Sequence, residues 1–149
     1  MAPTDLVSLA HHVADSTASR AEQAGIDLSL DLPTSELRVM GYAEGLQTAL
    51  ENLVDNALKF TPAGGSVEVG AQAQSQTATI WVKDTGIGVP VADMDDLFSR
   101  FHRGRNVSAY PGNGLGLAIV KATMDIHGGT VAVESSPQGS RFELRLPLV

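Results

Sequence analysis

The sequence contains no cysteine, so it can form neither a disulfide framework nor a thiolate metal site. It also has no apolar run long enough to cross a bilayer, and the first residues, Met1 to Asp5, lack the basic start of a secretory signal. We therefore expect a soluble domain that has no direct contact with a membrane. The absence of thiols is consistent with a reducing, cytoplasmic location.

Positive charge is also scarce, with 10 Lys and Arg against 17 Asp and Glu and a net charge of −7. Nucleic acids favour basic surfaces, so we expect no nucleic acid partner. Three of the few cations, Arg100, Arg103 and Arg105, nevertheless fall within six positions. Such a local cluster of positive charge is suited to a single anionic ligand.

The 149 residues fit one domain, of which 43% are hydrophobic and 18% charged. A chain of this length buries about two-thirds of its unfolded surface, which is enough for a core. The composition is that of a globular protein rather than a disordered one.

Hydrophobic spacing predicts helices and strands in an order that favours an α+β fold. Thr4 and Asp5 are expected to cap a first helix that carries Leu6, Leu9 and Val13 on one face. Further helices are predicted at residues 44–59, 91–99 and 115–126, strands at 26–32, 38–41, 66–73, 77–83, 130–134 and 141–146, and a polar loop at 102–114. Because hairpins join several strands, we expect a two-layer α/β sandwich that begins with a helix, not a parallel, doubly wound sheet.

The helix at residues 44–59 has two distinct stripes. Leucines form one, and Asn52, Asn56 and Lys59 form another at i, i+4 and i+7, roughly 100° around the helix. Asparagine is a poor residue for a helix interior, so a pair on one line needs a reason. An Asn oxygen that binds Mg²⁺ beside a lysine that binds phosphate is one reason. A solvated helix edge explains the pattern equally simply.

Two glycine-rich segments also have the residues of a ligand site. Asp84 follows an apolar strand and precedes Gly86 and Gly88, which permit tight turning and close approach to a ligand. Residues 112–117 (Gly-Asn-Gly-Leu-Gly-Leu) open a helix, where free amides and the helix dipole favour an anion. An ordinary Asp-Gly turn and a flexible loop are the alternatives. No strand precedes the second segment, which excludes a dinucleotide-binding fold.

The histidines show no catalytic or metal-ligand spacing. His11 and His12 are expected on the surface of the first helix, and His127 is most simply a positive charge at a helix C-terminus. Phe98 and Phe101 are expected to pack in the core.

Taken in order, these segments resemble the boxes of sensor histidine kinase catalytic domains. Residues 52–62 (Asn-Leu-Val-Asp-Asn-Ala-Leu-Lys-Phe-Thr-Pro) resemble the N box, 84–88 the first glycine box, 98–101 (Phe-Ser-Arg-Phe) the F box and 112–117 the second glycine box. His127-Gly128-Gly129 and residues 139–142 (Gly-Ser-Arg-Phe) also match. The resemblance covers essentially the whole chain. The wider superfamily includes gyrase B, MutL and heat-shock chaperones.

The resemblance implies a Bergerat fold, in which three helices cover one face of a mixed, mostly antiparallel sheet and ATP lies between the layers. It implies that Asp84 accepts from the adenine amine, that Asn56 holds Mg²⁺ with Asn52 beside it, and that residues 102–113 form an ATP lid. Lys59 and Arg103 would contact phosphates and Phe60 the nucleoside. The remaining binding positions of the two glycine boxes are Gly86, Gly88, Gly112, Gly114, Leu115, Gly116 and Leu117.

The reaction implied by the resemblance is phosphoryl transfer to a histidine, with Asn52, Lys59 and Arg103 as catalytic residues. Superfamily members that hydrolyse ATP place a glutamate where this chain has Asn52. Asparagine takes no proton at neutral pH, so we expect slow hydrolysis and an acceptor histidine on a separate helical hairpin. A response regulator would be an indirect partner.

The sequence departs from the family in two places. The phosphoacceptor motif, a histidine followed by an acidic residue, is absent, so we expect no dimerisation and phosphoacceptor domain within residues 1–149. The chain would then be a piece of a longer kinase or one partner of a split kinase, the parent being anchored in the inner membrane. Tyr42-Ala43 stands where many members carry Asp-Pro, which we interpret as a neutral loop change.

Three other functions share these boxes. They are a serine kinase that acts on an anti-sigma-factor antagonist, an ATP-gated module that dimerises, and an inactive domain kept for protein interaction. Asn52 disfavours the second, and the intact site residues disfavour the third.

Overall fold

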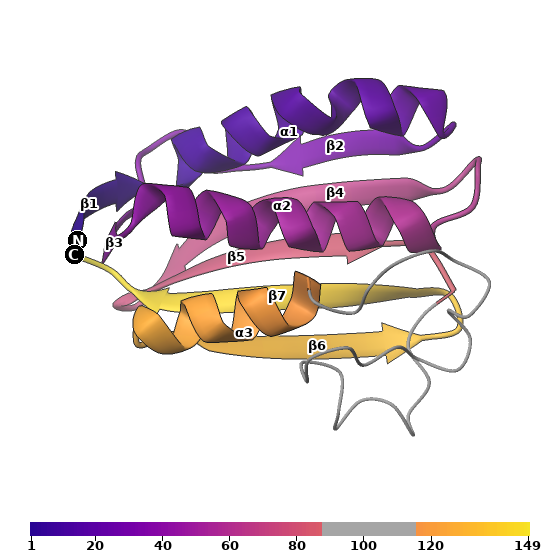
Figure 1. Cartoon of the computed structure of the whole chain (residues 1–149). Helices are drawn as coiled ribbons and strands as arrows, with labels where there is room; N and C mark the ends of the chain where they lie inside the picture. Colours follow the sequence, from indigo (N-terminus) through magenta and orange to yellow (C-terminus); the bar gives the residue numbers. More distant parts are fainter. Residues whose placement is uncertain (88–115) are drawn as a thin grey trace.

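The computed structural model describes residues 1–87 and 116–149, and the structural statements below concern these two ranges (Figure 1). They contain three helices and seven strands. The helices are α1 (Leu6–Gln23), α2 (Ala43–Phe60) and α3 (Gly116–Ile126). The strands are β1 (Ala2–Asp5), β2 (Asp27–Asp31), β3 (Arg38–Gly41), β4 (Ser66–Gln74), β5 (Thr77–Asp84), β6 (Thr130–Ser136) and β7 (Gly139–Pro147).

Five strands form one mixed sheet in the order β2-β4-β5-β7-β6. Only the pair β2 and β4 is parallel in this sheet, and the other pairs are antiparallel. The three helices of the described residues lie on one face of it (Figure 1). The predicted two-layer α+β sandwich is therefore confirmed.

The start of the chain was predicted incorrectly. The fold does not begin with a helix, because Ala2–Asp5 forms β1, which pairs antiparallel with β3 in a small separate sheet. Four residues that include a proline give too short a pattern to indicate a strand. The predicted cap is confirmed at Asp5, whose side chain accepts from the Val7 amide at 3.0 Å and from the Leu37 amide at 3.0 Å. Burial alone would raise the pKa of Asp5, but the hydrogen bonds that it accepts lower it.

The other predicted helices and strands within the described residues are confirmed, with small shifts of their ends. The predicted helix at residues 91–99 and the loop at 102–114 lie outside the described residues.

Alternate residues of the sheet face the helices and form one core. It is built by β4 (Val67, Val69, Ala71), β5 (Ala78, Ile80, Val82), β7 (Phe142, Leu144, Leu146), α1 (Leu6, Leu9, Ala10, Val13), α2 (Leu46, Ala49, Leu50, Leu53, Val54, Ala57) and α3 (Val120, Met124). The leucine stripe predicted for the second helix is thus buried, and the flanks of α2 remain for other contacts.

The opposite face of the sheet holds Trp81, which is only 7% exposed. Its indole nitrogen donates to Glu68 at 3.0 Å, and the Arg141 guanidinium lies 4.9 Å from the ring centroid. The ring lies over Gly70, where a Cβ atom would come within 2.1 Å of Trp81 Cζ2. Because three neighbours hold the ring, it has little freedom to move away.

We expect Gly70→Ala to lower the free energy of unfolding by about 1–3 kcal/mol, because the added methyl group displaces Trp81. Gly45→Ala in α2 is a matched control, since its Cβ would meet nothing closer than 3.8 Å. Alanine is the better helix residue, so this control should gain up to about 1 kcal/mol. Urea unfolding followed by the fluorescence of the single tryptophan measures both variants. Equal stabilities for the two variants would contradict this packing.

Candidate functional site

Asp84 ends β5 and is a buried carboxyl group, 7% exposed. Its Oδ1 atom accepts from the Gly86 amide at 2.8 Å and from the Ser140 amide at 3.3 Å. Burial raises the pKa of Asp84, although these two hydrogen bonds act to lower it. Among the hydrogen bonds of the described residues, Oδ2 accepts none, so one oxygen remains for a donor on a ligand.

The turn after Asp84 brings the end of β5 against the end of α2. The Ile87 amide donates to the Phe60 carbonyl at 3.2 Å, and a Cβ on Gly86 would lie 2.3 Å from the same oxygen. Only glycine fits there. The tight turn predicted at Gly86 is present, and it brings the backbone close to the Phe60 carbonyl.

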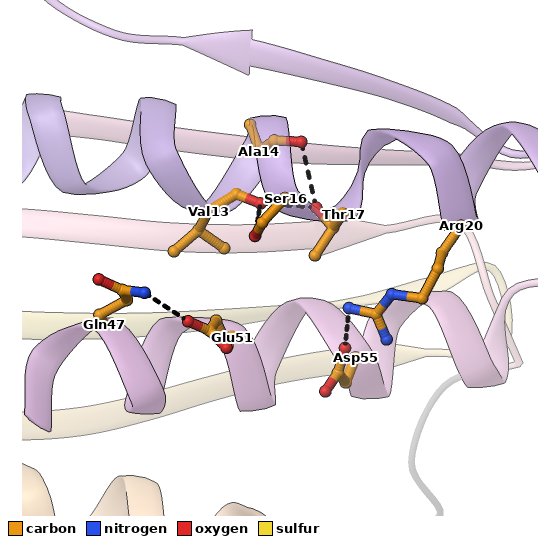
Figure 2. Close-up of polar contacts among 8 residues, drawn as sticks. All are labelled: Val13, Ala14, Ser16, Thr17, Arg20, Gln47, Glu51 and Asp55. Atoms are coloured by element: carbon orange, nitrogen blue, oxygen red, sulfur yellow. Dashed lines mark hydrogen bonds and ion pairs between the residues drawn. The ribbon is translucent and has the colours of Figure 1, made fainter. Parts of the chain in front are cut away.

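One flank of α2 faces α1 and is occupied by acidic residues. In Figure 2, Glu51 and Asp55 lie on this flank, where Gln47 donates to Glu51 at 2.8 Å and Arg20 pairs with Asp55 at 2.6 Å. Glu51 is thus turned away from Asn52 and is engaged by Gln47.

The other flank of α2 faces the first turn of α3. A Cβ on Gly116 would lie 3.4 Å from Asn52 Oδ1, so the two helices approach closely at this point. Asn52 Nδ2 is buried without a hydrogen-bond partner among the described residues. A buried amide left unpaired costs about 1–3 kcal/mol, so this atom needs a partner that the described residues do not supply.

The predicted site residues of the described ranges gather around the C-terminal half of α2. Asn56 is half-buried one turn beyond Asn52, and Lys59 is exposed near the end of the helix. Leu117 is partly buried and packs against the core. The interpretation of this flank as a bare solvated edge does not hold for Asn52, because α3 covers it.

Several predicted residues cannot be placed. Gly88, Arg103, Gly112, Gly114 and Leu115 lie outside the described residues, as do Phe98, Phe101 and the predicted lid at residues 102–113.

Sequence reasoning missed the contribution of Gly139 and Ser140. The Ser140 amide reaches Asp84 across the ladder of β5 and β7, in which the two residues are paired. A Cβ on Gly139 would lie 2.1 Å from the Asp84 carbonyl oxygen, and its φ of +152° favours glycine. The sequence offered only the family resemblance of residues 139–142, and it does not say which strand lies beside them.

The prediction for His127 is wrong. It is buried, its Nδ1 lies 2.7 Å from the Thr123 carbonyl, and its Nε2 accepts from the Tyr42 amide at 3.0 Å. A ring that donates at one nitrogen and accepts at the other is neutral, so it is not a helix-terminal charge. Tyr42 connects β3 to α2 as the N-cap of the helix, and Ala43 is the first residue of α2. His11 and His12 are exposed, as predicted.

No group of three or more His, Asp or Glu side chains with metal-binding geometry occurs in residues 1–87 and 116–149. None of the described helices combines the length and apolarity that a membrane span requires.

Residues 41–149 match the family described as histidine kinase-, DNA gyrase B-, and HSP90-like ATPase. The sensor protein kinase PmrB of Pseudomonas aeruginosa is 37% identical over 144 residues, which are 97% of this chain and 30% of that protein. The sensor-like histidine kinase SenX3 of Mycobacterium tuberculosis is 43% identical over 130 residues, which are 85% of this chain and 32% of that protein. The chain thus spans about a third of these relatives.

Solved structures of histidine kinases have the same fold. A mycobacterial sensor histidine kinase, MprB, has a TM-score of 0.86 and 30% identity, over 98% of this chain and 97% of that one. Full-length ShkA in complex with AMPPNP has a TM-score of 0.85 and 32% identity, over 99% of this chain and 31% of that one. The chain therefore belongs to the histidine kinase-, DNA gyrase B-, and HSP90-like ATPase family, as a catalytic domain of the sensor histidine kinase type.

Proposed function

We propose that the domain holds Mg-ATP between α2, the end of β5 and the start of α3, ready for transfer of the γ-phosphoryl group to a histidine on a separate helical hairpin. The observation that carries this proposal is Asp84, a buried carboxyl group with one oxygen bound and the other left available by residues 1–87 and 116–149. Nearly the whole of this chain resembles one part of ShkA, whose structure is a complex with AMPPNP. This supports a nucleotide as the ligand.

Asp84 would recognise the base. An amine on a purine donates a hydrogen bond to a carboxylate, and a hydrogen bond to a charged acceptor contributes about 1.5–3 kcal/mol. A guanine would present a carbonyl oxygen at the same ring position and meet Asp84 acceptor to acceptor. The site should therefore prefer adenine. Phe60, the last residue of α2, and Gly86 beside it would lie close to the base.

The triphosphate would lie toward the start of α3. The first amides of a helix have no partner within it, and the helix dipole favours negative charge at this end. Gly116 begins α3 directly beside Asn52, whose unpaired amide would also face the nucleotide. On sequence grounds we add the amides of Gly112, Gly114 and Leu115, the Gly88 turn and the lid at residues 102–113.

The residues present are suited to magnesium. Mg²⁺ in nucleotide sites keeps several waters and takes one or two protein oxygens together with phosphates. The half-buried Asn56 offers such an oxygen on the flank that carries Asn52, and Lys59 is exposed one turn further. When bound, the ion would neutralise phosphate charge; Lys59 and Arg103 would contribute positive charge to the same end of the nucleotide.

The domain would supply positioning and charge, not the nucleophile. Asn52 cannot accept a proton as a carboxylate does, and Glu51 is bonded to Gln47 on the other flank, so neither is placed to activate water. The acceptor histidine, the response regulator that follows it and an anchor in the inner membrane would belong to the rest of the parent protein. The relatives are named as sensor kinases, which favours a histidine acceptor over a serine acceptor.

The direct test mixes the purified domain with radiolabelled Mg-ATP and the helical hairpin of its parent kinase. We expect slow release of phosphate from the domain alone and an acid-labile phosphate on the hairpin when both are present. Acid-stable phosphate would instead indicate a serine acceptor, and rapid multiple turnover without the hairpin would indicate an ATPase. Either result would contradict the proposal.

We expect Asp84→Asn to weaken ATP binding at least tenfold, because the substitution replaces the acceptor that faces the adenine amine with a donor. The oxygen of the new amide can still accept from Gly86 and Ser140, so the fold should persist. Calorimetric titration measures the loss, and circular dichroism checks the fold. Wild-type affinity in the folded variant would contradict the role of Asp84.

The same variant should change the pH dependence of stability. Because burial raises the pKa of Asp84, its contribution to stability is complete below the ordinary aspartate value of 3.8 and is lost as the pH rises through the raised pKa. The amide side chain of Asp84→Asn does not ionise, so the stability of the variant relative to the wild type should increase from acid to neutral pH. Thermal unfolding without nucleotide measures this difference, and a decrease would contradict the expected cost of burying the charge.

We expect Asn56→Ala to weaken Mg-ATP binding by about tenfold or more, which corresponds to at least about 1.4 kcal/mol. Binding of ATP in EDTA should change less, since Asn56 acts through the metal. Titrations with and without magnesium give the two values. Equal losses in the two buffers would show that Asn56 has a structural role only.

A further inference from the structure

His127 forms hydrogen bonds through both ring nitrogens. Nδ1 lies 2.7 Å from the Thr123 carbonyl, which can only accept, so Nδ1 carries the proton. Nε2 lies 3.0 Å from the Tyr42 amide nitrogen, which can only donate, so Nε2 carries none. The contacts therefore select one neutral tautomer, and neither a protonated ring nor the other tautomer can make both bonds.

The partner of Nε2 is the residue from which α2 starts. Tyr42 is the N-cap of α2, and its side chain makes no capping hydrogen bond. Its ring instead meets the His127 ring edge to face, with centroids 5.7 Å apart. Gly41 leaves room for the imidazole, since a Cβ there would lie 2.9 Å from His127 Cδ2. His127 thus ties the C-terminal end of α3 to the N-terminal end of α2.

The two helices run in opposite directions side by side (Figure 1), so this contact lies at the far end of α3 from Gly116. At 1.5 Å per residue, about 15 Å separates Tyr42 from Asn52 along α2 and about 16.5 Å separates His127 from Gly116 along α3. The two spans agree to within one residue. The contacts His127–Tyr42 and Gly116–Asn52 can therefore form together in this alignment of the helices.

We propose that His127 is a positioning residue, which sets the alignment of α3 along α2 and so holds the first turn of α3 against Asn52. This inference rests on the proposed function, in which that turn faces the triphosphate. A slip of one residue moves the turn by about 1.5 Å, and an error of about 1 Å in position is enough to impair phosphoryl transfer. His127 would act on the phosphates through α3 without touching the nucleotide.

Two substitutions separate this role from simple stabilisation of a helix end. A glutamine amide can place its oxygen where His127 Nε2 lies and accept from Tyr42. An asparagine amide reaches only as far as Nδ1 and loses that bond. His127→Gln should therefore keep the alignment, whereas His127→Asn should not. Val13→Ala is the control: Val13 is buried on α1, so its truncation leaves a cavity that lowers stability without changing a residue of α3.

The first experiment needs no nucleotide. Hydrogen exchange of the amides at residues 120–122, which bond to the carbonyls of the first turn of α3 about two turns from His127, should rise at least tenfold in His127→Asn and remain near wild type in His127→Gln and Val13→Ala. A ¹⁵N spectrum of the imidazole should show the tautomer protonated at Nδ1. Unchanged exchange in His127→Asn, or protonation at Nε2, would overturn the proposal.

The second experiment compares Mg-ATP with adenosine, which lacks phosphates. His127→Asn should lose about tenfold in affinity for Mg-ATP and less than twofold for adenosine, and His127→Gln should bind both as the wild type does. Equal losses for the two ligands, or identical behaviour of the two variants, would overturn the positioning role. If the wild type itself bound no Mg-ATP, the proposed function would fail, and the exchange experiment would still decide whether His127 sets the alignment.

Discussion

A carboxyl group withdrawn from water at the end of β5 constrains the whole site. Burying Asp84 disfavours its charged form, and the described residues offset this cost at only one of its two oxygens. The two donors come from different parts of the chain, since Gly86 lies two residues after the end of β5 and Ser140 is the second residue of β7. Glycine at positions 86 and 139 allows the backbone to approach closely enough for both. The result is a fixed acceptor with one open side, which is what discrimination between purines requires.

Helix α2 connects this acceptor to the rest of the site because each of its sides contacts a different part of the fold. Its leucines pack on the sheet, its acidic flank meets α1 through Asp55 and Arg20, and its asparagine flank meets α3 at Gly116. The end of the same helix touches the turn after Asp84 through the Phe60 carbonyl. The groups proposed to bind the base, the metal and the phosphates are therefore held relative to one rigid element, and a shift of α3 would alter the phosphate end without disturbing the base.

The placement of several candidate site residues could be predicted from local patterns. Asn52, Asn56 and Lys59 share a stripe because helical periodicity is a local property, and Asp84 was a candidate because it follows an apolar strand, but the roles proposed for them came from the family resemblance. The contacts of Ser140 and His127 were not found, because they depend on which strands and helices become neighbours. A glycine-flanked turn does not reveal that its amide will face a carboxylate from a distant part of the sequence. Similarly, a histidine at the end of a helix suggests a favourable positive charge. Only the fold shows that a backbone amide, that of Tyr42, donates to its ring nitrogen. Strand β1 was missed because four residues with a proline carry no periodicity.

The most direct measurement is a pair of calorimetric titrations of the wild-type domain with ATP and GTP, each with and without magnesium. With magnesium, ATP should bind at least tenfold more tightly than GTP, since only adenine offers a donor to the open oxygen of Asp84. Removal of magnesium should weaken ATP binding and leave the preference for adenine. Equal affinity for the two nucleotides in magnesium would contradict the role of the buried carboxylate, and with it the proposed mode of nucleotide binding.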